Sequence, residues 1–116
     1  MAASQDMAMA LYRFKSRETS DLVMLQAHGQ RILEILGKTP HGPGILRPEE
    51  MPAAVVALRQ AVQAEEALQQ RLREEAQARG ELPPAFDPVN LRVRSAPFID
   101  MLQRCEQAGV ELVWGV

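Results

Sequence analysis

Leu36–Pro52 reads LGKTPHGPGILRPEEMP and contains four of the chain's eight prolines and three of its seven glycines. Proline fixes φ and lacks a backbone donor, while glycine opens positive φ, so this composition specifies one backbone path. The segment separates two stretches that have helical spacing. We therefore predict a rigid corner, in which Ile45 and Leu46 turn inward or form a very short extended piece.

Two strands are predicted before this corner. Leu11–Ser16 alternates, with Tyr12 and Phe14 on one face and basic side chains on the other, which is typical of a half-buried strand. Asp21–Leu25 is apolar on both faces, so it is predicted to be more enclosed than the first strand. The short polar link between them favours an antiparallel hairpin.

Three helices are predicted after the strands. Apolar spacing indicates a helix over Gly29–Leu36, and a long helix that starts near Pro48, since proline suits a first helical turn. The apolar stripe of the long helix thins beyond Glu65, so its second half should be exposed and should project. Asn90 can cap a last helix over Leu91–Gln107.

The alternating segment Val110–Val116 predicts a terminal strand that pairs with Leu11–Ser16, with Glu111 near Arg13 or Lys15 on the outer face. The expected fold is α+β, with a small, about three-stranded and mainly antiparallel sheet built from both chain ends. Three helices pack on one face of it, one of them long and partly projecting. Residues 9–116 form the single domain, and residues 1–8 are expected to be a disordered tail.

Composition excludes several classes of function. The chain of 116 residues has a formal net charge of −2, which gives no general electrostatic reason to bind nucleic acid or an anionic membrane. No apolar run approaches the roughly 20 residues that span a bilayer. The single cysteine, Cys105, excludes an intramolecular disulfide, fits a reducing compartment and lies on an apolar helical face, which predicts burial.

No catalytic, cofactor or metal site is predicted. His28 and His41 are the only histidines, and neither has a cysteine or carboxylate at ligand spacing. The serines carry no nucleophile motif. Gly37-Lys38-Thr39 closes a helix instead of opening one, so it is not a phosphate-binding loop.

Two kinds of binding site remain open. Lys38, His41 and Arg47 could gather around backbone donors of the Pro/Gly segment, residues 37–48, and hold a small molecule or an anion. Such a domain could also be enzymatic, although a protein that is not an enzyme is favoured.

The other kind of site would bind a protein. Arg13, Lys15 and Arg17 form a basic ladder on one strand face, which can protect an edge strand or dock an acidic partner. Leu68 and Leu72 on the long helix could make a short helix-pair contact, with a partner or by self-association. Polar residues interrupt the heptad pattern there, so an extended coiled coil is not indicated.

An ordered set of short segments resembles a known family. The segments are Leu11–Ser16, Asp21–Leu25, Leu36–Lys38, Gly44–Leu46, Pro48, Met51–Ala54, Leu91-Arg92, Pro97 and Val113–Val116. Together they resemble the bacterial family known as domain of unknown function 1840. The resemblance implies a small, soluble, cytoplasmic bacterial protein, and it implies no activity, cofactor or catalytic residue. The favoured function is a protein-interaction module, and the alternative is a small-molecule or anion-binding domain.

Overall fold

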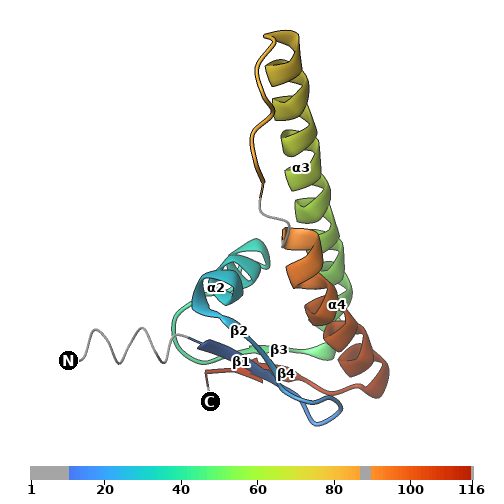
Figure 1. The fold of residues 1–116 in the computed structure, drawn as a ribbon. Helices are drawn as coiled ribbons and strands as arrows, with labels where there is room; N and C mark the ends of the chain where they lie inside the picture. The colour runs from blue at the N-terminus through green and yellow to red at the C-terminus, as the bar shows by residue number, and fades with distance from the viewer. Residues whose placement is uncertain (1–10, 87–89, 116) are drawn as a thin grey trace, which may run out of the picture.

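In the computed structural model, which describes residues 11–86 and 90–115, helices cover one face of a four-stranded antiparallel sheet (Figure 1). The strands lie in the order β2-β1-β4-β3. This arrangement confirms the predicted α+β class, whereas the predicted tail, residues 1–8, lies outside the described residues. The strands are β1 (Leu11–Lys15), β2 (Leu22–Leu25), β3 (Gly44–Leu46) and β4 (Leu112–Trp114), and the helices are α2 (Gln26–Ile35), α3 (Met51–Ala78) and α4 (Leu91–Ala108).

The predicted number of strands is one too few, because the Pro/Gly corner contains β3. This strand pairs with β4 through Gly44↔Trp114, Ile45↔Val113 and Leu46↔Leu112. A Cβ atom at Gly44 would lie 2.2 Å from Cζ2 of Trp114, so only glycine lets the backbone lie over the indole ring. The sheet therefore combines the two chain ends with a strand from the middle of the sequence.

The prediction that β2 is more enclosed than β1 is wrong. β2 is an edge strand, and Val23 and Leu25 are 42% and 59% exposed. The helices occupy the opposite face of the sheet, where the alternate residues Leu22 and Met24 pack against the core. The segment does carry apolar residues on both faces, but the helices cover only one of these faces.

The first helix begins earlier than predicted, at Gln26, directly after β2. Its inner side presses against β1, where a Cβ atom at Gly29 would lie 2.6 Å from the ring of Tyr12. The helix ends as predicted at Gly37, which has φ 74°. The amide of Lys38 donates to the carbonyl of Leu33 at 2.8 Å, as in a glycine-terminated helix.

The long helix begins after a 3-10 turn, Pro48–Glu50, in which the amide of Arg47 donates to Oε1 of Glu50 at 2.9 Å. Asn90 caps α4 as predicted, since its Oδ1 accepts from the amide of Val93 at 3.2 Å. Pro97 lies inside α4 without ending it.

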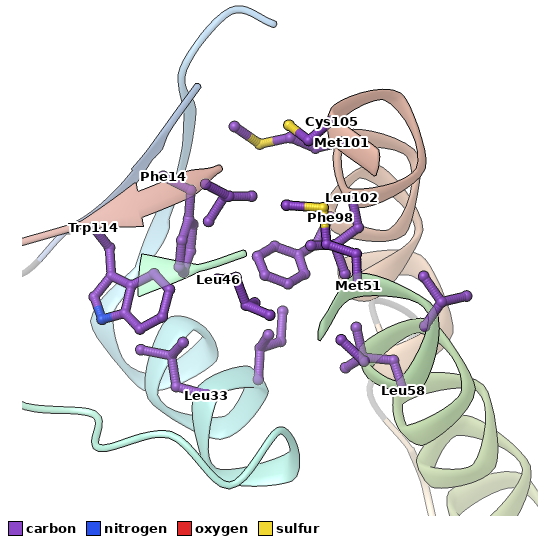
Figure 2. Packing of buried hydrophobic residues seen from close by; sticks show 14 residues of the cluster. Phe14, Leu33, Leu46, Met51, Leu58, Phe98, Met101, Leu102, Cys105 and Trp114 are labelled. Atoms are coloured by element: carbon purple, nitrogen blue, oxygen red, sulfur yellow. The ribbon is translucent and has the colours of Figure 1, made fainter. Parts of the chain in front are cut away.

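The terminal strand is shorter than predicted, but it pairs with β1 as expected. The register is Phe14↔Trp114 and Lys15↔Val113. The inner sides of these strands meet the helices in one core, where the ring of Phe14 lies 4.9 Å from that of Phe98 and 6.0 Å from that of Trp114 (Figure 2). Cys105 is fully buried in the same core, as predicted.

The second half of α3 projects beyond the body, as predicted (Figure 1). A helix of 28 residues is about 42 Å long at 1.5 Å per residue. The chain then returns along the helix: the amide of Glu81 donates to the carbonyl of Ala76 at 2.8 Å, and the Arg73 guanidinium lies 4.9 Å from the centroid of the Phe86 ring. Ala76 is buried by this return. The projection is therefore a helix with an extended segment beside it.

Candidate functional site

The sheet face that points away from the helices, here called the outer face, carries exposed apolar side chains. Leu11 and Leu25 lie directly opposite each other in the β1–β2 register, and they are 51% and 59% exposed. Val23 lies opposite Arg13 on the same face, and Ile45 opposite Val113 continues it across the sheet. The outer face therefore carries apolar surface on all four strands, interrupted on β1 by Arg13 and Lys15.

Basic side chains border this apolar surface. Arg13 makes a long, exposed ion pair with Asp21, with 3.5 Å between Nη1 and Oδ2. Lys15 and Arg17 line a shallow hollow of about 580 Å³ together with Glu111, which lies on the side of the sheet predicted for it. Among the described residues neither Lys15 nor Arg17 makes an ion pair, so both cations remain available to a binding partner.

A second hollow, here called the end hollow, lies where β4 stops and β1 continues. β4 pairs with β1 only at Phe14 and Lys15, so the β1 edge over residues 11–13 has no strand partner on that side among the described residues. The loop that carries His41 closes the other side of this space. The end hollow therefore arises from unequal strand lengths at one end of the sheet.

The end hollow has a volume of about 420 Å³ and a basic lining. Arg13, Lys15 and His41 contribute to it, as do the amide side chain of Gln26 and the aromatic Tyr12. No carboxylate belongs to the lining as far as the structure describes the chain. The site is therefore suited to a negatively charged group.

The loop over the end hollow is fixed to β1. The hydroxyl of Tyr12 donates to the carbonyl of Pro40, one residue before His41. On the far side, Gly115 has φ 73°, and a Cβ atom there would lie 2.7 Å from Cα of Pro43. Tight backbone packing thus holds the walls of the hollow in place.

Trp114 also lines the end hollow, but its indole N–H is buried and cannot donate to a ligand there. Nε1 is buried and has no hydrogen-bond partner within residues 11–86 and 90–115. It lies against Gly44, where a Cβ atom would be only 2.6 Å away. The unsatisfied donor is therefore a cost of the tight contact between β3 and β4.

The three predicted anion-binding residues do not act together. Lys38 Nζ lies 3.0 Å from Glu50 Oε2, and Glu50 also accepts from the amide of Arg47. That backbone hydrogen bond and the Lys38 ammonium hold the pKa of the Glu50 carboxyl below its ordinary value. Only His41 lines the end hollow, and its basic companions there are Arg13 and Lys15. The structure thus places His41 beside Arg13 and Lys15, and it places Lys38 beside Glu50.

The predicted contact pair on the long helix is divided in the structure. Leu68 is 45% exposed, whereas Leu72 is half-buried. The returning segment, which contains Phe86, runs along this half of α3 (Figure 1). Leu68 is therefore a single exposed side chain next to a partly occupied helix face.

A polar junction that the sequence did not predict joins the three helices. Glu65 on α3 accepts from the amide of Leu91 at 2.9 Å and from Arg31 at 3.1 Å. His28 on α2 contacts Arg94 on α4. These contacts bridge positions far apart in the chain, so no local sequence pattern could have indicated them.

A bidentate ion pair continues this junction along α3 and α4. Arg92 donates to both carboxylate oxygens of Glu66, at 2.6 and 2.9 Å. These hydrogen bonds hold the pKa of Glu66 below its ordinary value and raise that of Arg92. The polar groups of this region are used to position helices.

Neither a metal-binding cluster nor a helix that could cross a membrane occurs among the described residues. Within the described ranges, no three His, Cys, Asp or Glu side chains gather closely enough to hold a metal ion. None of the helices that the structure describes has the length and apolar character needed to cross a bilayer.

No curated protein and no solved structure gives a significant match to this chain. One family model does match, over residues 9–114, and its description is Domain of unknown function (DUF1840). The match spans every strand and helix that the structure describes, together with the outer face and the lining of the end hollow except Gly115. The protein therefore belongs to the DUF1840 family.

Proposed function

We propose that this protein is an interaction module that docks an acidic segment of another protein on the outer face of its sheet. The observation that carries this proposal is the exposure of Leu11, Val23 and Leu25 on adjacent strands of that face. A one-layer sheet that faces water normally alternates apolar residues inward with polar residues outward. Here β2 is apolar on both sides, and contiguous exposed apolar surface is typical of a binding face.

Charge favours a foreign acidic partner over a second copy of the chain. A twofold interface is built from the same patch of both subunits, so it would bring the Lys15 and Arg17 of both copies into one buried area. Like charges that meet at an interface cost several kcal/mol as an order of magnitude. An acidic segment would instead pair with these cations while its apolar residues cover Val23 and Leu25.

The sheet is preferred over the long helix as the docking surface. Leu68 offers one exposed apolar side chain, and the returning segment already lies beside that half of α3. The outer face offers several apolar side chains in a fixed register, so more area can be buried without reordering the backbone. A surface that is formed before binding loses less conformational entropy on binding.

The proposal can be tested by site-specific photo-crosslinking in cells. A photoreactive phenylalanine analogue would replace Leu25 on the outer face or, as a matched control, Arg104 on α4, which is also exposed. We expect a defined crosslinked product only from position 25. Mass spectrometry should place the attached residue within an acidic segment, and the purified partner should bind at least about tenfold more weakly to Leu25→Ser and Arg17→Glu.

Four results would overturn the proposal. A product of twice the chain's mass would show that a second copy covers the face. Binding to anionic phosphatidylserine vesicles that is lost in Leu25→Ser would make the surface a lipid-binding one. Equal crosslinking from position 104, or a partner segment without acidic residues, would remove the basis for the proposed specificity.

A further inference from the structure

We propose that the end hollow binds a small organic anion that carries a carboxylate or a phosphate group. The hollow lies at one end of the sheet, while the docking surface lies across its outer face. The two share Leu11, Arg13 and Lys15. The ligand site does not depend on the proposed docking function, and residues that belong to only one of them can separate the two.

The charge of the hollow carries the argument furthest. Lys15 and His41 line it without a hydrogen-bond or ion-pair partner among the described residues, and Arg13 is engaged only in its long contact with Asp21. No described carboxylate in the lining offsets them. The cationic donors Arg13 and Lys15 can form charge-assisted hydrogen bonds with a carboxylate or a phosphate in this small space, and the imidazole of His41 lies beside them. By contrast, the cation of the originally predicted site, Lys38, is already neutralised by Glu50.

The size and the remaining lining indicate an organic anion larger than a bare inorganic ion. A volume of about 420 Å³ falls within the range of about 300–1,000 Å³ that is usual for small-molecule pockets. The half-buried Tyr12 provides aromatic surface, and Gln26 provides an amide that can orient a polar group; Trp114 borders the hollow but is only 2% exposed. The lining thus matches a molecule with a flat apolar body and one anionic end.

The walls of the hollow are held before any ligand arrives. The Tyr12–Pro40 hydrogen bond fastens the loop of His41 to β1, and Gly115 packs against Pro43 on the other side. A preformed site loses less conformational entropy on binding than one that must be ordered by its ligand. The tight backbone contacts therefore favour binding at this position.

The test uses two anionic probes and a neutral one. Phenyl phosphate and benzoate carry the two candidate groups on the same ring, and benzyl alcohol carries the ring without the charge. Each is titrated into the full chain by isothermal calorimetry, and the fluorescence of the single tryptophan, Trp114, reports on the hollow. We expect saturable binding of at least one anion, with benzyl alcohol at least about tenfold weaker, which corresponds to about 1.4 kcal/mol.

Variants locate the site. Lys15→Met keeps the aliphatic stem and removes the charge, and His41→Gln keeps a polar side chain; each should weaken binding of the anion by about fivefold or more. Arg17→Met, two residues beyond Lys15, is the matched control, and Lys38→Met is the control from the Pro/Gly segment. Both controls should bind as the unchanged chain does. All four changes are at exposed or half-buried positions, and circular dichroism melts would confirm that the variants fold.

The outcomes separate the possible ligands and can overturn the proposal. Selective binding of phenyl phosphate assigns a phosphate ligand, selective binding of benzoate assigns a carboxylate, and equal binding assigns the shared charge. The proposal would be overturned if none of the anions showed saturable binding up to about 10 mM, because a dissociation constant above that value is far weaker than that of a typical ligand site. Equal binding of benzyl alcohol would also overturn it, as would an equal loss in Arg17→Met, which would indicate an adventitious ion only. Leu25→Ser should leave anion binding intact and His41→Gln should leave docking intact, so either proposal can fail alone.

Discussion

The two faces of the sheet carry similar side chains but have different surroundings. On the inner face, Phe14 is fully buried beneath the helices (Figure 2), and Leu112 is fully buried as well. On the outer face of the same sheet, Leu11 and Val23 lie about half exposed. Alternation in a strand decides which residues share a face, and the helices decide which face is covered. The difference shows that an apolar strand residue contributes to folding only when another layer covers it.

The largest expected effect comes from removing a side chain that links the inner face to the helices. Phe14→Ala would delete the ring that contacts both Phe98 and Trp114, leaving a cavity in the core. We expect a loss of about 3–5 kcal/mol in the free energy of unfolding, measured by urea denaturation. Leu11→Ala on the same strand is the matched control and should cost less than about 1 kcal/mol. Equal losses would mean that the two faces do not differ as described.

A second change tests the close packing of the inner face at the sheet edge. Gly44→Ala would place a methyl group on the ring of Trp114, and overpacking of this kind typically costs about 1–3 kcal/mol. The loss should be smaller when Trp114→Leu is already present, since the smaller side chain removes the clash. A double-mutant cycle measures this coupling. Additive losses would show that Gly44 is required for a reason other than the indole contact.

The same contrast explains how much could be predicted from the sequence. The alternation of Tyr12 and Phe14, the cap at Asn90 and the helix end at Gly37 are local signals, and the structure confirms them. The very short extended piece predicted at Ile45 and Leu46 was not assigned to the sheet, because its pairing depends on Gly44 meeting Trp114, which is far away in the chain. The prediction that β2 is more enclosed than β1 was wrong, because no pattern within Asp21–Leu25 shows where the helices lie.

The candidate site divides in the same way. The basic ladder on β1 could be predicted, because alternation places Arg13 and Lys15 on one face. Their association with His41 could not be, since it depends on where β4 stops and how the Pro/Gly corner bends. The ion pair of Lys38 with Glu50 could not be predicted for a similar reason, because Glu50 is brought to Lys38 only by the 3-10 turn.

A smaller effect is expected at the corner that delivers β3 to the sheet. Glu50 binds both the amide of Arg47 and Lys38, and its side chain is 40% exposed, so Glu50→Gln should cost only about 1 kcal/mol or less at neutral pH. The folded pKa of Glu50 is lowered, so its stabilising effect is fully present above the ordinary value of 4.5 and is lost as pH falls through the folded value. Urea denaturation of both proteins from pH 7 to pH 3 should show the difference shrinking with acid.

Glu49→Gln is the matched control for this pH dependence, because it changes a neighbouring carboxylate that makes no ion pair among the described residues. Its difference from the unchanged chain should stay near zero throughout. A constant difference for Glu50→Gln across the whole range would show that the ionised carboxylate contributes nothing to the corner.

The smallest effect on stability is expected on the outer face, where the functional effect should be greatest. Leu25→Ser replaces a side chain that is 59% exposed, and surface changes of this kind usually alter the free energy of unfolding by about 0.5 kcal/mol or less. The same change removes apolar surface from the proposed docking face, so it should weaken binding of the purified partner by at least about tenfold while the melting curve stays in place. Met24→Ser, one residue away on the inner face, is the matched control and should lower stability, because Met24 packs against the core. If Leu25→Ser destabilised the chain as much as Met24→Ser, then the outer face would be part of the folding core, and its apolar side chains would need no partner to explain them.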